Sequence, residues 1–380
     1  MALSPDGSAP APGRVGVTFD GTAHAYGVTG GGTFRLSSDK VRIGGAGAAQ
    51  PGVIVLSESL FAQGFSRYEI NGNAGLEIAD GAMVRPVMPV YRPRSVNPDA
   101  GASSVADALE LWTPPVFQED PLAGRMSQRL GASLSLSAFA PYQPKPEGGL
   151  RIGAGALVEV DPGQVIQLQS RGMLRISGTL RAPGCRIEAA RGADPVVGIQ
   201  LQKGGLSNSI WLDGQARLDV AGISATGIDT AGRQYGLQRD GGRIALDGEF
   251  VVIRPGAVLD ASGTRMDVDV PMPGAAAVRT RIGGKGGEIA LSATAGLYLD
   301  GDMRAAGGTP DAPGGKLSLR LETPLYDAGT PDEMIRPREL VVAQASRASL
   351  LPVGARAGFG HAELWPGPHR RRSDPGRRLR

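Results

Sequence analysis

A glycine pair followed by a short alternating segment recurs along the middle of the chain. The instances are Gly148–Ile152, Gly241–Leu246, Gly286–Leu291 and Gly314–Leu319, and the last three share the pattern GG-[RKE]-[IL]-[AS]-L. Apolar residues fall at every second position after each pair, which is the period of a β-strand with one buried face. The last three pairs are 45 and 28 residues apart. The repeat is therefore uneven in length, and loops such as 264–281 are expected to project from it.

Two further units predict turns between these strands. The first aligns Ile78–Met83, Val160–Val165 and Ile253–Val258, with glycine at the fourth place, where a type II turn needs a positive φ. The second is expected to close a strand with Asp or Ser and Gly, at Leu174–Gly178, Leu246–Gly248, Leu259–Gly263 and Leu299–Gly301. Short strands separated by glycine corners predict an all-β protein. A sandwich or barrel stays possible, but the likeness of the units favours a right-handed parallel β-helix, a solenoid whose strands stack at about 4.8 Å.

The pattern divides the chain into three parts. Residues 1–147 are predicted to form an irregular N-terminal portion of the β-helix, interrupted by a proline-rich excursion at about 86–121. Within that excursion, residues 105–112 (VADALELW) are the one plausible short helix. Residues 148–350 are predicted to be regular β-helix repeats. Residues 351–380 lose the alternation and are predicted to form a disordered basic tail.

Composition limits the classes of partner. The 58 glycines in 380 residues are about twice the share of an ordinary soluble domain. The net charge of +3 comes from residues 369–380, which hold six Arg and one Asp; without them 34 basic residues stand against 36 acidic ones. We therefore predict no nucleic-acid partner. The chain shows no export signal and no apolar run long enough to span a bilayer, so no membrane insertion is predicted.

The acidic and glycine-rich motifs do not predict a site. Asp300 and Asp302, with Asp267 and Asp269, are carboxylates of a kind that can bind calcium, but ordinary turns with outward carboxylates explain them better. The stretch 283–287 (GGKGG) resembles a phosphate loop, yet the required spacing fails, since Arg and Gly occupy the positions that need Gly and Ser or Thr.

The single cysteine and the tryptophans do not predict a functional site either. Cys185 excludes an internal disulfide and stands where related repeats carry a small corner residue. The stretch 191–194 (RGAD) is not an integrin-type motif. Trp112, Trp211 and Trp365 are expected to pack under loops, the alternative being stacking on sugars. We predict no catalytic, cofactor-binding or metal-binding residue.

Several longer phrases resemble the large exoproteins of the filamentous haemagglutinin family, which leave Gram-negative bacteria by two-partner secretion. The phrases are Gly64–Gly72, Phe117–Pro121, Gly178–Gly184 and Gly296–Ala305, and the likeness covers about Phe34 to Val353. The resemblance implies a parallel β-helix fibre and an outer-membrane transporter as partner. The NPN-type motifs of the family's secretion domain are missing, since the nearest stretch, Asn97-Pro98-Asp99, does not match. The chain therefore resembles an internal fragment of such a protein. Our hypothesis is that its C-terminal tail is translated from an out-of-frame coding sequence.

The expected function follows from this resemblance. The chain is predicted to be a structural or adhesive segment of a secreted, cell-surface fibre that binds an unidentified receptor or glycan, and not to be an enzyme. One alternative is a β-helix polysaccharide lyase or hydrolase, which would need converging carboxylates or calcium. A second alternative is the stalk of a contact-dependent toxin.

Overall fold

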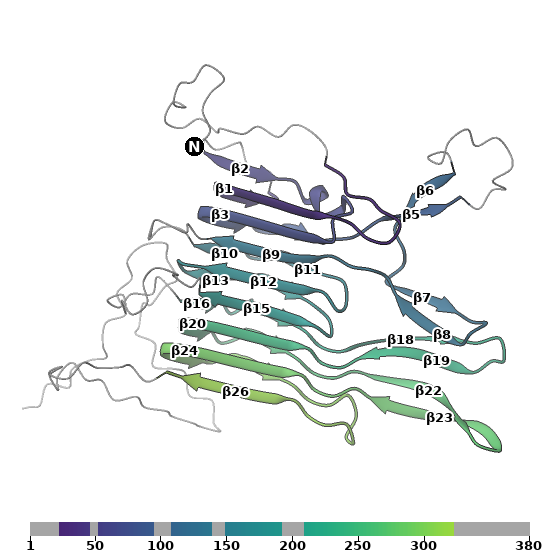
Figure 1. Ribbon diagram of the computed structural model, residues 1–380. Helices are drawn as coiled ribbons and strands as arrows, with labels where there is room; N and C mark the ends of the chain where they lie inside the picture. Colours follow the sequence, from purple (N-terminus) through teal and green to yellow (C-terminus); the bar gives the residue numbers. More distant parts are fainter. Residues whose placement is uncertain (1–22, 46–51, 95–107, 139–148, 192–208, 323–380) are drawn as a thin grey trace, which may run out of the picture.

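A computed structural model describes residues 23–45, 52–94, 108–138, 149–191 and 209–322. These residues form strands β1 to β26 and one short 3₁₀ helix, η1 (Glu58–Ala62), with no α-helix among them. Most strands pair in parallel (Figure 1). The prediction of an all-β protein is therefore confirmed. The predicted tail, the Asn97–Asp99 stretch, most of 191–194 and Trp365 lie outside the described residues.

The parallel strands form three ladders of paired segments. Ladder 1 consists of the first halves of β1 (Thr33–Ile43), β3 (Arg67–Ile78), β20 (Arg243–Ile253) and β24 (Glu288–Leu299), with all of β9 (Ser133–Ala138), β12 (Val165–Ser170), β15 (Arg186–Arg191) and β26 (Lys316–Leu321). Ladder 2 consists of the second halves of the four long strands, with β2 (Val53–Leu56), β10 (Leu150–Ile152), β13 (Leu174–Ile176) and β16 (Ile210–Leu212). Ladder 3 consists of β4 (Met83–Val84), β11 (Leu157–Glu159), β14 (Thr179–Arg181), β17 (Arg217–Asp219), β21 (Val258–Asp260) and β25 (Asp302–Arg304).

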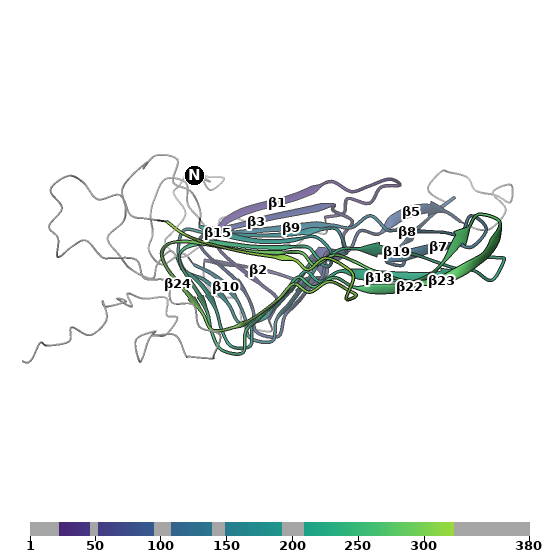
Figure 2. The same cartoon turned by 90° about the horizontal axis from the view of Figure 1, so that it is seen from below.

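Ladders 1 and 2 are joined through the long strands. Hydrogen bonding closes a ring of eight parallel strands in the order β3, β9, β12, β15, β20, β16, β13 and β10. In β1 and β20 the register of pairing shifts midway, between Ser38 and Lys40 and between Gly248 and Phe250. Seen along the stack, the strands of successive passages lie over one another around a common interior (Figure 2).

Like residues lie above like residues in the core. On ladder 1, Ile187, Ile244 and Ile289 follow one another in register, and all are at most 2% exposed. The three later glycine-pair motifs are equivalent, since Arg243, Glu288 and Lys316 pair in register. This alternation buries one side of each strand, and every buried Leu, Ile or Val contributes about 1.5–3 kcal/mol.

Two details of the sequence interpretation are wrong. The segment after Gly149 belongs to ladder 2, where Leu150 pairs with Leu76 and Leu174, so it is not equivalent to the later glycine-pair motifs. Leu246–Gly248 does not close a strand either, because β20 continues through it to Ile253. A glycine in the sequence indicates that the chain bends. It does not show whether the bend is a turn between two strands or lies within a single strand.

Backbone contact explains the glycine pairs. A Cβ atom added at Gly242 would lie 2.0 Å from the carbonyl oxygen of Cys185, one added at Gly287 would lie 1.9 Å from that of Gly242, and one added at Gly315 would lie 2.0 Å from that of Gly287. Each second glycine thus sits directly on the corner of the preceding passage. Any side chain there would push the strands apart.

Four antiparallel hairpins project from the ladders on one side (Figure 1). They are β5 (Val90–Pro93) with β6 (Leu109–Trp112), β7 (Phe117–Asp120) with β8 (Arg125–Gln128), β18 (Ile223–Ile228) with β19 (Gln234–Arg239), and β22 (Arg265–Met272) with β23 (Ala275–Gly283). All are inserted between a ladder 3 strand and the next ladder 1 strand. The expected projection of 264–281 is confirmed. The helix predicted at 105–112 is wrong, because Leu109–Trp112 is a strand that pairs with β5; residues 105–107 lie outside the described part.

An aromatic cluster fills the N-terminal end of the stack. Phe61 of η1 is fully buried, and its ring centroid lies 5.0 Å from that of Tyr68, whose hydroxyl donates to the Leu60 carbonyl at 3.1 Å. Phe65 and Phe34 pack against the same tyrosine, with centroids 5.6 and 6.2 Å away. Burial raises the pKa of Tyr68 to about 12. This end of the core is therefore covered by the chain itself.

Candidate functional site

Three of the projecting hairpins, β7–β8, β18–β19 and β22–β23, contact one another and form what we call the wing. The Thr230 amide donates to the Pro121 carbonyl at 3.2 Å, which joins the turns of the first two hairpins. The Ser224 hydroxyl donates to the Arg265 carbonyl at 3.1 Å, which joins the last two. The wing is thus a layered unit outside the core.

Glycines bring the layers of the wing close together. A Cβ atom at Gly227 of β18 would lie 2.7 Å from a Glu119 carboxylate oxygen of β7, and one at Gly236 of β19 would lie 3.0 Å from the Met266 sulfur of β22. The middle hairpin therefore faces one neighbour with each of its two sides.

Arginines bind the acidic residues of the last hairpin. Asp269 accepts hydrogen bonds from Arg279 Nε at 2.6 Å and Nη2 at 3.0 Å. Asp267 accepts them from Arg281 Nε at 2.9 Å and Nη2 at 3.4 Å. The Arg279 hydrogen bond, aided by the Gln234 backbone N–H, lowers the pKa of Asp269 to about 2. Arg281 lowers the pKa of Asp267 in the same way.

These ion pairs occupy the carboxylates of Asp267 and Asp269, which the sequence offered as candidate calcium ligands. Both carboxylates already have cationic partners, and Asp302 pairs with Arg304. No group of three or more His, Cys, Asp or Glu side chains fit to hold a metal ion occurs in the part of the chain that the structure describes. The sequence interpretation missed the pairing, although the Pro273-Gly274 turn between two alternating segments signals a hairpin that brings the two charges together.

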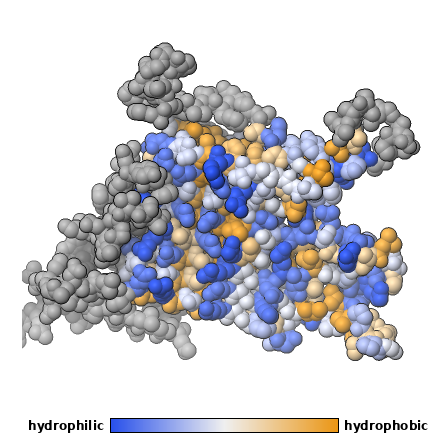
Figure 3. Space-filling model, viewed as in Figure 1, coloured by the Kyte–Doolittle hydropathy of each residue, from blue (hydrophilic) through white to orange (hydrophobic). Residues whose placement is uncertain are grey.

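The wing also exposes large apolar side chains. Leu122 in the β7–β8 turn is 87% exposed, Ile228 64%, Val278 52% and Met272 49%. Apolar patches are visible on the wing among hydrophilic side chains (Figure 3). Apolar residues on hairpins that project from the core are accessible to a partner, and such patches mark interaction surfaces more often than isolated residues do.

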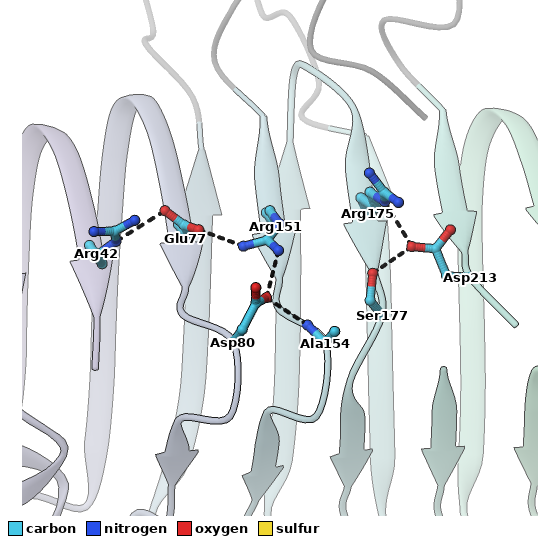
Figure 4. A network of polar contacts seen from close by, with 8 residues as sticks. All are labelled: Arg42, Glu77, Asp80, Arg151, Ala154, Arg175, Ser177 and Asp213. Carbon is cyan, nitrogen blue, oxygen red and sulfur yellow. Dashed lines mark hydrogen bonds and ion pairs between the residues drawn. The ribbon is translucent and has the colours of Figure 1, made fainter. Parts of the chain in front are cut away.

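Charged residues cross the outer side of ladder 2 from strand to strand (Figure 4). Glu77 pairs with Arg42 at 3.2 Å and with Arg151 at 2.5 Å, and Arg151 also pairs with Asp80 at 2.5 Å. The Asp80 carboxylate accepts from the Ala154 amide at 2.8 Å. Burial of Asp80 opposes ionisation, but these hydrogen bonds lower its pKa on balance. The cations and anions of this network neutralise one another, so it holds neighbouring strands in register.

The outer side of ladder 2 changes character farther along the stack. Arg175 and the Ser177 hydroxyl share the carboxylate of Asp213, at 2.7 and 2.5 Å. Trp211 occupies the outward position next to Arg175, yet it is only 2% exposed. Its indole N–H donates to Asp213 at 3.1 Å, and the Arg254 guanidinium lies 6.0 Å from its ring. Trp211 is therefore packed, and its side-chain contacts are Asp213 and Arg254.

The remaining sequence candidates lie apart. Trp112 packs beneath the Arg92 guanidinium, 4.4 Å from its ring. Cys185 lies in an open furrow of about 570 Å³ along the glycine-pair corner, beside Arg186 and Arg243. The histidine in the described part, His24, bonds Gln63 at the other end of the stack. The structure thus brings none of these groups together.

Comparison of the chain with family models, with curated proteins and with solved structures finds no match. Among the residues that the structure describes, no helix has the length and apolar character needed to cross a membrane.

Proposed function

We propose that the ladders are the faces of a right-handed parallel β-helix. From β3 onward, wherever consecutive ladder strands are described, the chain passes from ladder 1 to ladder 2 to ladder 3 and back to ladder 1. The segment from β2 through η1 to β3 departs from this order, because it passes from ladder 2 to ladder 1 directly. A repeated order of parallel strands with uniform register is what a coil requires, and parallel crossovers are right-handed in nearly all proteins. On this reading the eight-stranded ring is two adjacent faces of the coil, joined by long strands that bend at the register shifts.

The function that this geometry supports best is structural and adhesive. The chain acts as a segment of a secreted bacterial surface fibre of the filamentous haemagglutinin kind, and it is not an enzyme. The observation that carries the proposal is the insertion of all four hairpins at one corner of the repeat, since a rod with a lateral wing presents a surface along its length. The glycine contacts at the corners, the buried residues in register and the ion pairs between strands all stabilise the proposed rod.

Partners follow from the same proposal. The full-length protein would leave the cell through an outer-membrane transporter and bind a receptor or glycan at a cell surface. The wing is the contact region, because its apolar side chains Leu122 and Ile228 project from the rod. Neither nucleic acid nor insertion into a membrane is part of the proposal.

An adhesion assay tests the proposal. Beads coated with the full chain should bind to epithelial or bacterial cell layers above albumin-coated beads, and the variant Leu122→Asp with Ile228→Asp should bind at least about fivefold less, roughly 1 kcal/mol. Val55→Asp, which places the same charge at a 42% exposed apolar position on β2 outside the wing, is the control and should bind normally. Wild-type beads that bind no better than albumin would refute adhesion. Cleavage of uronic-acid polymers in the presence of calcium would favour the enzyme alternative instead.

A further inference from the structure

Two glycines leave a hollow on the outer side of ladder 2. Gly75 of β3 lies next to Gly149 on the neighbouring passage, where the Leu76 amide donates to the Gly149 carbonyl at 3.1 Å. These glycines precede Glu77 and Arg151 by two positions, and alternate residues of a strand share a face. Both glycines therefore belong to the outward side, where neither has a side chain to fill the surface. A pocket of about 230 Å³ opens there.

Cationic side chains line this pocket. Lys40, Arg42 and Arg151 contribute to its walls, and Glu77 is the one carboxylate among the described lining residues. These side chains come from β1, β3 and β10, which pair in register as neighbouring strands of ladder 2. Figure 4 shows Arg42, Glu77 and Arg151 following one another across the strands. Three positive charges thus surround one negative charge.

The lysine differs from the two arginines in its partners. Glu77 pairs with Arg42 Nε at 3.2 Å and with Arg151 at 2.5 Å, and Arg151 also pairs with Asp80 at 2.5 Å. These four charges neutralise one another. Lys40 has no ion pair with a carboxylate of the described residues. Its ammonium therefore gives the pocket a net positive charge, and the terminal nitrogens of Arg42 remain available as donors.

We propose that this pocket binds one small oxyanion, a phosphate or a carboxylate, between the Lys40 ammonium and the Arg42 guanidinium. The two residues are two positions apart on β1, about 6–7 Å along the strand, so one anion can contact both. Ammonium and guanidinium groups are the usual cationic donors to these anions. The volume is smaller than the about 300–1,000 Å³ of pockets for drug-sized ligands. It suits a single charged group, either free or carried by a sugar.

Amide NMR of the full chain at constant ionic strength tests the proposal, with inorganic phosphate, glucuronate and neutral glucose as probes. Phosphate or glucuronate should shift the Gly75 and Leu76 amides with a Kd of about 1 mM or tighter, whereas glucose should not. Lys40→Gln should weaken this binding at least about fivefold. Lys316→Gln makes the same change at a 72% exposed side chain at the other end of the stack. It is the matched control and should change the Kd less than about twofold.

The other outcomes are equally decisive. Binding of phosphate alone or of glucuronate alone supports the site and identifies the anionic group that it accepts. A weaker Kd for both anions, an equal response to glucose, or an unchanged Kd in Lys40→Gln overturns the inference. Equal weakening by Lys40→Gln and Lys316→Gln also overturns it, because the overall charge of the protein would then explain the binding. The site lies outside the wing, so none of these results affects the proposed adhesion.

Discussion

Substitution of Gly287 by alanine probes the contact on which the stacking depends. The new Cβ atom would lie 1.9 Å from the Gly242 carbonyl oxygen, whereas carbon and oxygen atoms in contact are normally about 3.3 Å apart or more. The backbone would have to separate by more than about 1 Å at a corner where the Glu288 amide donates to Gly242 at 2.9 Å and the Gly287 amide donates to Ala261 at 2.7 Å. An opening of that size takes both bonds beyond the usual hydrogen-bond range.

The cost can be estimated from these bonds. The two lost backbone hydrogen bonds, at about 0.5–1.5 kcal/mol each, with some loosening of the buried Ile289, predict a destabilisation of about 2–4 kcal/mol. Urea unfolding followed by circular dichroism measures it as a lower midpoint at unchanged slope.

Two glycines with open surroundings serve as controls. Gly30→Ala should be almost neutral, because nothing lies within 4 Å of its added Cβ. Gly232→Ala meets no neighbour either, but φ is +74° there, so it should cost about 1–2 kcal/mol. A Gly287→Ala protein within about 0.5 kcal/mol of wild type would refute the close-contact explanation.

Three further predictions concern charged and titrating groups. Arg129→Met should destabilise the fold by about 3–5 kcal/mol, because Asp161, 8% exposed and bonded at 2.6 and 2.8 Å, would lose its partner; adding Asp161→Asn should recover much of this in urea unfolding. Arg279→Gln should raise the pKa of Asp269 from about 2, as measured by carboxyl NMR. In the wild type, the ionised Asp269 stabilises the fold above about pH 4, and this stabilisation is lost as the pH falls toward 2. In the variant, this pH-dependent stabilisation should be smaller. Tyr68 should ionise near pH 12 or only on unfolding, in an ultraviolet titration.

The local signals in the sequence were sufficient to predict strands and turns. The glycines expected to need a positive φ have it, with values of 71° at Gly81, 79° at Gly163 and 92° at Gly256. The place of each turn in the fold was not predictable from the motif. Gly81 and Gly256 precede strands of ladder 3, whereas Gly163 precedes a strand of ladder 1. A type II turn has the same local requirements at any corner, so only the register of stacking assigns it.

The wrong helix at 105–112 shows tertiary context overriding a local preference. Leu109–Trp112 has residues acceptable in a helix, but Leu111 pairs with Tyr91, and Arg92 bonds Glu110 at 2.7 Å while stacking on Trp112. Those partners precede it by about twenty residues, across a stretch that no short window includes. The Asp269–Arg279 pair differs, because the local Pro273-Gly274 turn signals the hairpin that brings these two residues together.

The position of the wing follows from the geometry of stacking. Successive passages of a parallel ladder are about 4.8 Å apart, whereas sheets that pack face to face need about 10 Å. Hairpins rooted on consecutive passages, such as β18–β19 and β22–β23, would therefore collide if both carried full side chains on facing sides. Gly236 opposite Met266, like Gly227 opposite Glu119, removes a side chain where the layers meet. The glycines that let the backbone stack at the corners thus have counterparts in the wing, and both sets are needed for the hairpins to leave the ladders on one side and remain packed.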